Sequence, residues 1–180
     1  KYYAWIPRGG DVPRNIPAEP EQAKPVEKTV QYRVPLPMVT IGYKLPGWRS
    51  DDHYALALLA TVLGGGDSSR LDRLLVHGKN PLAVSAGAGH NQREDSGVFM
   101  VRATLLKGRN EAEVEKALTG AVAEVVEKGV TPEELAKAKT LEEVGLINGR
   151  QTCTSIANEL GEEAVFGGDP HRVNTVFQKL

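Results

Sequence analysis

Two strand-like segments with no helix between them limit the folds open to this chain most strongly. Residues 82–90 are small and apolar, residues 97–106 are more strongly apolar, and a polar stretch separates them. Residues 30–34 and 39–43 alternate apolar and polar side chains and form a second predicted pair. Strands that come in pairs join antiparallel sheets, whereas parallel strands need a long crossover, usually a helix. The sequence therefore predicts an α+β fold, with an antiparallel sheet and helices packed on one face.

Helical patterns follow each predicted strand pair, over residues 52–63, 68–76, 110–128, 131–148, 154–166 and 170–180. The clearest start is Thr131-Pro132-Glu133-Glu134, a capping box with proline at the first helical position. Residues 52–63 are apolar nearly all round, which predicts deep burial. Cys153 is predicted to be a small buried apolar residue.

The first 25 residues differ from the rest in composition. Five prolines fall between residues 7 and 25, with few large apolar side chains among them. We therefore expect residues 1–25 to be the end of a preceding domain plus a proline-rich linker, and residues 26–180 to be the α+β domain. The chain starts at Lys1 and stops at Leu180 inside a helical pattern. We expect a piece of a longer protein, with the domain truncated at its C-terminal end.

Composition argues against several classes of partner. The 22 basic and 23 acidic residues nearly cancel, and no run of like charges indicates a nucleic-acid partner. No apolar run approaches the roughly 18 residues that a membrane span needs. A single cysteine excludes an internal disulfide.

A glycine run, Gly64-Gly65-Gly66, lies between two predicted helices. A Walker phosphate loop requires a lysine and a preceding strand, and this segment has neither. A nucleophile elbow, G-x-S-x-G, requires a glycine two residues after the serine, and neither Ser68 nor Ser69 has one. The run is therefore predicted to end the first helix, with a residue among 67–69 capping the next.

Metal-binding spacings are absent as well. H-E-x-x-H and H-x-x-E-H do not occur around the four histidines, which are His53, His77, His90 and His171. We therefore predict no metal site and assign no catalytic residue in this chain. A solvated acidic face is predicted on the helix at 131–148, formed by Glu133, Glu134, Glu142 and Glu143.

Taken in order, these segments resemble the non-catalytic domain of the M16 (pitrilysin or insulinase) zinc metallopeptidases, also called the peptidase M16 inactive domain. The similarity rests on residues 2–9, on the helix and glycine run at 51–71, on the segment at 129–139 and on residues 168–174. It implies an α+β domain of the LuxS/MPP-like metallohydrolase fold. It also implies that zinc is bound in the full-length protein by H-x-x-E-H and a further glutamate of another, upstream domain.

In this family two homologous halves enclose a substrate chamber. The resemblance therefore implies two partners, a peptide substrate and a homologous M16 half in the same chain or in a partner subunit. It places candidate substrate contacts at Gly64, Gly65, Gly66, Ser68, Arg70, His77 and Val84. His77 and Val84 stand where the family pattern has arginine and tyrosine. They lack the guanidinium fork and the phenol hydroxyl with which those residues hold a substrate.

Two functions remain open from the residues. The full-length protein is either a zinc endopeptidase, in which this domain walls the substrate chamber, or a non-catalytic module of the M16 fold that binds partners or supports an assembly. The family's bacterial members imply a place in the periplasm or cell envelope.

Overall fold

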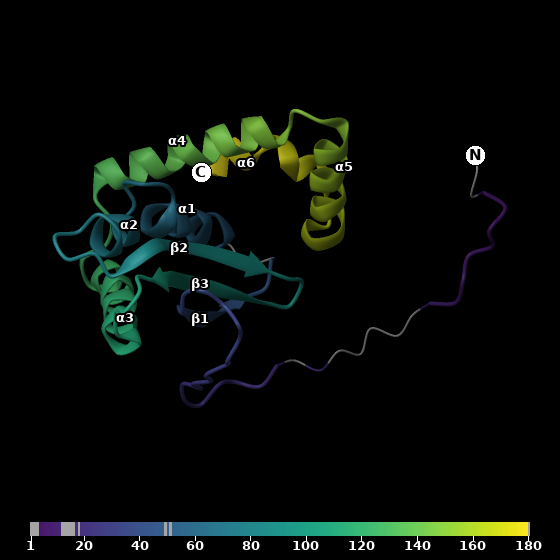
Figure 1. Ribbon diagram of the computed structural model, residues 1–180. Helices are drawn as coiled ribbons and strands as arrows, with labels where there is room; N and C mark the ends of the chain where they lie inside the picture. Colours follow the sequence, from purple (N-terminus) through teal and green to yellow (C-terminus); the bar gives the residue numbers. More distant parts are fainter. Residues whose placement is uncertain (1–3, 12–16, 18, 49, 51, 180) are drawn as a thin grey trace.

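The computed structural model describes residues 4–11, 17, 19–48, 50 and 52–179 (Figure 1). Strand β1 (Met38–Pro46) precedes helices α1 (His53–Gly64) and α2 (Arg70–Leu75). The hairpin of β2 (Ala83–Gln92) and β3 (Ser96–Leu105) follows. The remaining elements are α3 (Glu111–Lys128), α4 (Pro132–Gly149), α5 (Cys153–Glu162), the π-helix η1 (Glu163–Gly167), the 3-10 helix η2 (Pro170–Asn174) and α6 (Val176–Lys179).

The three strands form an antiparallel sheet in the order β1-β3-β2. The central strand is β3, where Val101 pairs with Ile41 of β1 on one side and with Ala88 of β2 on the other. Strand β2 bulges between Ala83 and Ser85 and is an outer strand of this sheet. The predicted antiparallel α+β class is confirmed.

The hydrophobic core lies between one face of the sheet and helices α1, α2 and α3. Alternate residues of β3 point into it, and the helices add five fully buried side chains, Leu63, Leu71, Leu75, Val114 and Leu118. Each such side chain stabilises the fold by roughly 1.5–3 kcal/mol relative to an exposed position. Helix α4 runs across α1 as an outer layer, and α5 projects from its end (Figure 1).

The predicted strand at residues 30–34 is wrong. This segment has no regular structure, and the side chains of Val30, Tyr32 and Val34 are 57%, 79% and 61% exposed. An alternating pattern states which side chains share a face, but a strand also needs a partner for its backbone N–H and C=O groups. No strand of the described sheet lies beside this segment. Only the second segment of the predicted pair forms a strand.

Two burial predictions also need correction. The buried residues of α1 are Ala60, Val62 and Leu63, so burial is confined to its C-terminal part. Cys153 is exposed at the first residue of α5, a helix with no buried residue. Cys153 is exposed because α5 projects from the body of the domain, so no other element covers its side chains (Figure 1). The predicted helix at 154–166 begins at Cys153 and becomes a π-helix at Glu163.

The capping box at Thr131 has the predicted geometry. The side chain of Thr131 accepts a hydrogen bond from the backbone N–H of Glu134 at 3.2 Å, and the backbone N–H of Thr131 donates to Oε2 of Glu134 at 2.9 Å. We expect Thr131→Ala to lower the free energy of unfolding by about 1 kcal/mol, because a helix N–H loses its acceptor. Urea unfolding followed by circular dichroism measures this change.

Thr140→Ala is the matched control in the same helix. The hydroxyl of Thr140 donates to the carbonyl oxygen of Ala136 at 3.1 Å, a bond that does not cap the helix. The expected change is within about 0.5 kcal/mol. Equal losses in the two variants would contradict the capping role of Thr131.

Candidate functional site

The glycine run closes α1 against strand β2. A Cβ atom on Gly64 would lie 2.0 Å from the backbone nitrogen of Ala88, so only glycine allows this approach. The N–H of Gly65 donates to the carbonyl oxygen of Thr61 at 2.8 Å and ends the helix. Gly66 has φ +83°, a left-handed conformation that favours glycine. The run is a joint between two helices, as predicted, and each glycine has a structural reason.

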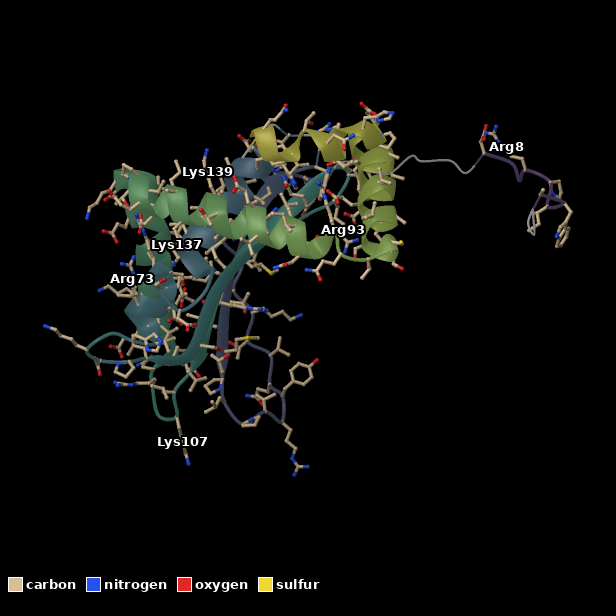
Figure 2. All side chains as sticks on the ribbon, turned by 90° about the horizontal axis from the view of Figure 1, so that it is seen from above. Arg8, Arg73, Arg93, Lys107, Lys137 and Lys139 are labelled. Atoms are coloured by element: carbon tan, nitrogen blue, oxygen red, sulfur yellow. The ribbon has the colours of Figure 1, made fainter. Side chains whose placement is uncertain are left out.

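The serines after the glycines have different roles. Ser69 is buried and caps α2, accepting a hydrogen bond from the N–H of Asp72 at 3.4 Å. Ser68 is exposed, and its hydroxyl accepts a hydrogen bond from Nζ of Lys137 on α4. Figure 2 shows Lys137 on the same side of α4 as Arg73 of α2. The loop is thereby tied to α4 and still presents Ser68 at the surface.

Arg70, the cationic candidate on the loop, is occupied by an internal ion pair. Its Nε donates to Oε1 of Glu134 at 2.8 Å and its Nη2 donates to Oε2 at 2.6 Å. The same Nη2 donates to the carbonyl oxygen of Gly129 at 3.0 Å. The hydrogen bonds from Arg70 lower the pKa of Glu134 to about 2. Arg70 therefore fastens α2 to the start of α4, which leaves less of its guanidinium for a peptide.

The predicted solvated acidic face is correct only in part. Glu133 and Glu143 are exposed, whereas the side chain of Glu134 is only 20% exposed in its pair with Arg70. Glu142 is half-buried and accepts a hydrogen bond from the hydroxyl of Thr61 on α1. Helix α4 packs over α1, so Glu142 faces α1 and Glu134 faces Arg70 at the start of α2. The charge pattern of a helix does not reveal which turn another helix will cover.

The other two candidates lie at the opposite end of α2. The side chain of His77 is 62% exposed, and its Nε2 lies 3.2 Å from Oδ2 of Asp72. Val84 is 45% exposed on β2, beside the bulge. The N–H of Leu82 donates to the carbonyl oxygen of Leu75 at 2.8 Å and holds the end of α2 at the start of β2. His77 and Val84 are therefore both available at the surface.

Together the candidates border strand β2 at two points. Gly64 contacts the middle of the strand, and Val84 lies near its beginning. Residues 83–89 of β2 have small side chains, and its outer edge pairs with no other described strand. An open strand edge has N–H and C=O groups that an extended peptide can bind. A separate groove of about 390 Å³ lies between α4 and α5, and no candidate residue lines it.

Comparison with known proteins decides the family. A model of the peptidase M16 inactive domain matches residues 1–142. The chain belongs to the peptidase M16 inactive-domain family. An uncharacterized zinc protease of Mycobacterium leprae is 31% identical over 142 residues, which are 79% of this chain and 32% of that protein. A zinc protease of Helicobacter pylori is 33% identical over 128 residues, which are 69% of this chain and 28% of that protein.

Solved structures agree with the family assignment. A protease from Helicobacter pylori superposes with a TM-score of 0.72 at 27% identity, over 81% of this chain and 35% of that one. An inactive peptidase domain from Bordetella parapertussis gives a TM-score of 0.70 at 26% identity, over 83% of this chain and 81% of that one. This M16 inactive domain spans about a third of the length of the curated relatives it matches.

Zinc in the relatives raises the question of whether this M16 inactive domain has ligands of its own. Within the described ranges, no three His, Cys, Asp or Glu side chains lie close enough together to hold a metal ion. The described residues therefore do not fit a zinc site. In the same part of the chain, no helix is both long enough and apolar enough to cross a membrane.

Sequence reasoning missed two contacts in this M16 inactive domain. It assigned Glu134 to the capping box but not to Arg70, which lies 64 positions away. It also named His53 and His90 only among four histidines without a metal-binding spacing, although their ring centroids lie 5.6 Å apart. No motif spacing signals either contact, because each depends on how separate elements pack. For the contact between Arg70 and Glu134, the only sequence signal is that one helix starts with an arginine and another has a carboxylate in its capping box.

Proposed function

We propose that this domain is the non-catalytic wall of a substrate chamber in a larger M16 zinc metalloendopeptidase. The wall binds an extended peptide along the outer edge of β2. Zinc and the catalytic glutamate come from a homologous half, in the same chain or in a partner subunit. The domain itself contributes binding and assembly rather than chemistry.

The observation that carries this proposal is the open edge of β2 beside the glycine joint. Natural sheets protect outer strands with lysine, proline or a covering element. Residues 83–89 contain none of these side chains, and their small size leaves the edge accessible. An added strand gains affinity from main-chain hydrogen bonds, so such an edge binds peptides with little sequence preference.

The residues at the start of β2 suit binding better than catalysis. Val84 has no hydroxyl with which to stabilise an oxyanion. His77, at 62% side-chain exposure, can contact a peptide as a single donor or acceptor but cannot form a two-pronged bond as arginine does. A role for this domain in holding the substrate is therefore consistent with both replacements.

Val84→Lys in the full-length protein tests the proposal. The side chain of Val84 is 45% exposed, so the change should leave folding intact, while a charge at the strand edge disfavours strand addition. We expect KM for a quenched-fluorescence peptide to rise about threefold to tenfold with kcat nearly unchanged, because ground-state and transition-state binding weaken together. Zinc content, measured by metal analysis, should not change.

Val126→Lys on α3 is the matched control, since Val126 is 81% exposed and lies on a different element. It should leave KM unchanged. An unchanged KM for Val84→Lys would exclude β2 as the peptide site. If the full-length protein hydrolyses no peptide and no chelator-sensitive activity exists, the domain instead belongs to a non-catalytic module that binds partners.

A further inference from the structure

Five aromatic and imidazole rings meet where the loop before α1, the first turn of α1, the end of β2 and η1 come together. The ring of Trp48 lies 4.3 Å from His53 and 5.9 Å from Phe166, measured between centroids. His53 lies 5.1 Å from Tyr54 and 5.6 Å from His90, both edge to face. Rings at these separations attract each other beyond the effect of burial. The cluster therefore joins elements that are distant in sequence.

Hydrogen bonds set the tautomer of His53. The side-chain amide of Gln92 donates to the carbonyl oxygens of Pro46 at 3.2 Å and Gly47 at 3.5 Å. Its Oε1 therefore faces Nδ1 of His53, at 2.6 Å. Nδ1 must carry the hydrogen of that bond, since Oε1 can only accept.

His90 is held in its neutral form by its surroundings. Burial lowers its pKa, the neighbouring imidazole of His53 lowers it further, and Glu142 of α4 acts in the opposite direction. His53 is hydrogen-bonded to the uncharged Gln92, and Tyr54 lies beside it on α1. A charge on either imidazole opposes a charge on the other. The folded cluster therefore disfavours a charge on His90.

Phe166 connects this cluster to the C-terminal part of the chain. It belongs to η1, and elements α5, η1, η2 and α6 make their strongest contacts with one another rather than with the sheet. Arg150 ties this segment to α4 by donating to the carbonyl oxygen of Val173 at 2.7 Å. The contact of Phe166 with Trp48 ties it to the loop before α1.

We propose that His53 and His90 form a pH-sensitive latch. At neutral pH the uncharged ring of His90 packs against His53, which contacts Trp48, and Trp48 in turn contacts Phe166 of the C-terminal segment at residues 153–179. Acidification charges His90, the ring cluster loosens, and the contact between Trp48 and Phe166 opens. This property is independent of the peptide-binding role proposed above.

The direction in which the latch responds to pH follows from proton linkage. The folded state binds the proton of His90 more weakly than an open state with the ordinary pKa of 6.5. The latch is therefore fully closed above that value and weakens as the pH falls below it, because the open state then binds more protons. Protonation of carboxylates acts at lower pH, near about 4, so it does not account for a change in the range where histidine titrates.

Acrylamide quenching of Trp48 tests the latch in the 180-residue chain. The chain has two tryptophans, so Trp5→Phe leaves Trp48 as the only tryptophan, which excitation at about 295 nm selects over the tyrosines. We expect the quenching constant to rise about twofold or more between about pH 7.5 and 5.5, the range in which a histidine titrates. His90→Gln and His90→Phe, whose side chains cannot be charged, should both remove this rise. His171→Gln should keep it, because His171 is exposed on η2 and outside the cluster.

Hydrogen exchange of the wild-type chain gives a readout that needs no variant at His90. Amides of residues 163–174, corrected for intrinsic rates, should exchange faster at the lower pH, while amides of β3 should not. The proposal fails if Trp48 quenching and exchange at 163–174 are both independent of pH. It also fails if the variants at His90 fold and keep the wild-type pH response.

Discussion

Gly64→Ala is expected to lower the free energy of unfolding by at least about 3 kcal/mol, the range of severe overpacking. The added Cβ would lie 2.0 Å from the backbone nitrogen of Ala88 and 2.7 Å from the carbonyl carbon of Gly87. Both obstacles are backbone atoms of a hydrogen-bonded strand, so no side chain can move aside. The last turn of α1, with the fully buried Leu63, must shift away from β2. Urea unfolding followed by circular dichroism measures the loss.

Gly120→Ala is the control for Gly64. Gly120 lies inside α3, and beyond the backbone of its own helix no described heavy atom lies within 4 Å of the position its Cβ would take. Alanine restricts the unfolded chain and favours the helix, so this variant should gain about 0.5–1 kcal/mol. If Gly64→Ala were as stable as the wild type, the close approach of α1 to β2 would be refuted.

Glu134→Ala is expected to lower the free energy of unfolding by about 2–3 kcal/mol, because it leaves Arg70 of a part-buried ion pair without its charged hydrogen-bond partner. The side chains of Arg70 and Glu134 are 15% and 20% exposed, so water replaces the lost contacts poorly. The carboxylate also completes the capping box of α4. Glu133→Ala, one position earlier and exposed, should change stability by less than about 0.5 kcal/mol.

A double-mutant cycle with Arg70→Ala separates the ion pair from the cap. If the pair dominates, the double variant should be more stable than the sum of the two single losses predicts, by about 1–2 kcal/mol. Additive losses would mean that Arg70 and Glu134 act independently, contrary to the two hydrogen bonds that join them.

The same pair predicts how stability depends on acid. Arg70 lowers the pKa of Glu134 from 4.5 to about 2. The folded state therefore favours the carboxylate, and the unfolded state takes up a proton at higher pH. The contribution is complete above pH 4.5 and is lost as the pH falls from 4.5 toward 2. Glu134→Gln, which cannot titrate, should differ from the wild type at neutral pH and converge with it across this window.

The sequence carried enough information for the elements whose signals are local. The capping box at Thr131 depends on residues three positions apart, and it was predicted with its partner. The hairpin of β2 and β3 and the stripe of Val114 and Leu118 on α3 were also recognisable, because periodicity reflects which side faces a core. The family resemblance rested on residues 2–9, 51–71, 129–139 and 168–174, and it was confirmed.

Predictions failed where the outcome depended on a partner element. Residues 30–34 alternate like a strand but have no strand beside them among the described residues. Cys153 is a small apolar residue of a type common in protein cores, but it lies exposed on α5, which projects from the body. In both cases the side-chain pattern was compatible with burial. Burial itself depends on what packs against the segment.

By itself, the sequence determined the α+β class, the helix joint at Gly64-Gly65-Gly66 and the absence of a zinc-binding motif, because each rests on residue identity at short spacing. Tertiary structure alone decided that Arg70 is bound to Glu134, that the glycine joint contacts the outer strand β2, and that His53 and His90 share one cluster of rings. These contacts join residues 23 to 64 positions apart, and their energies arise only once the sheet and helices have packed.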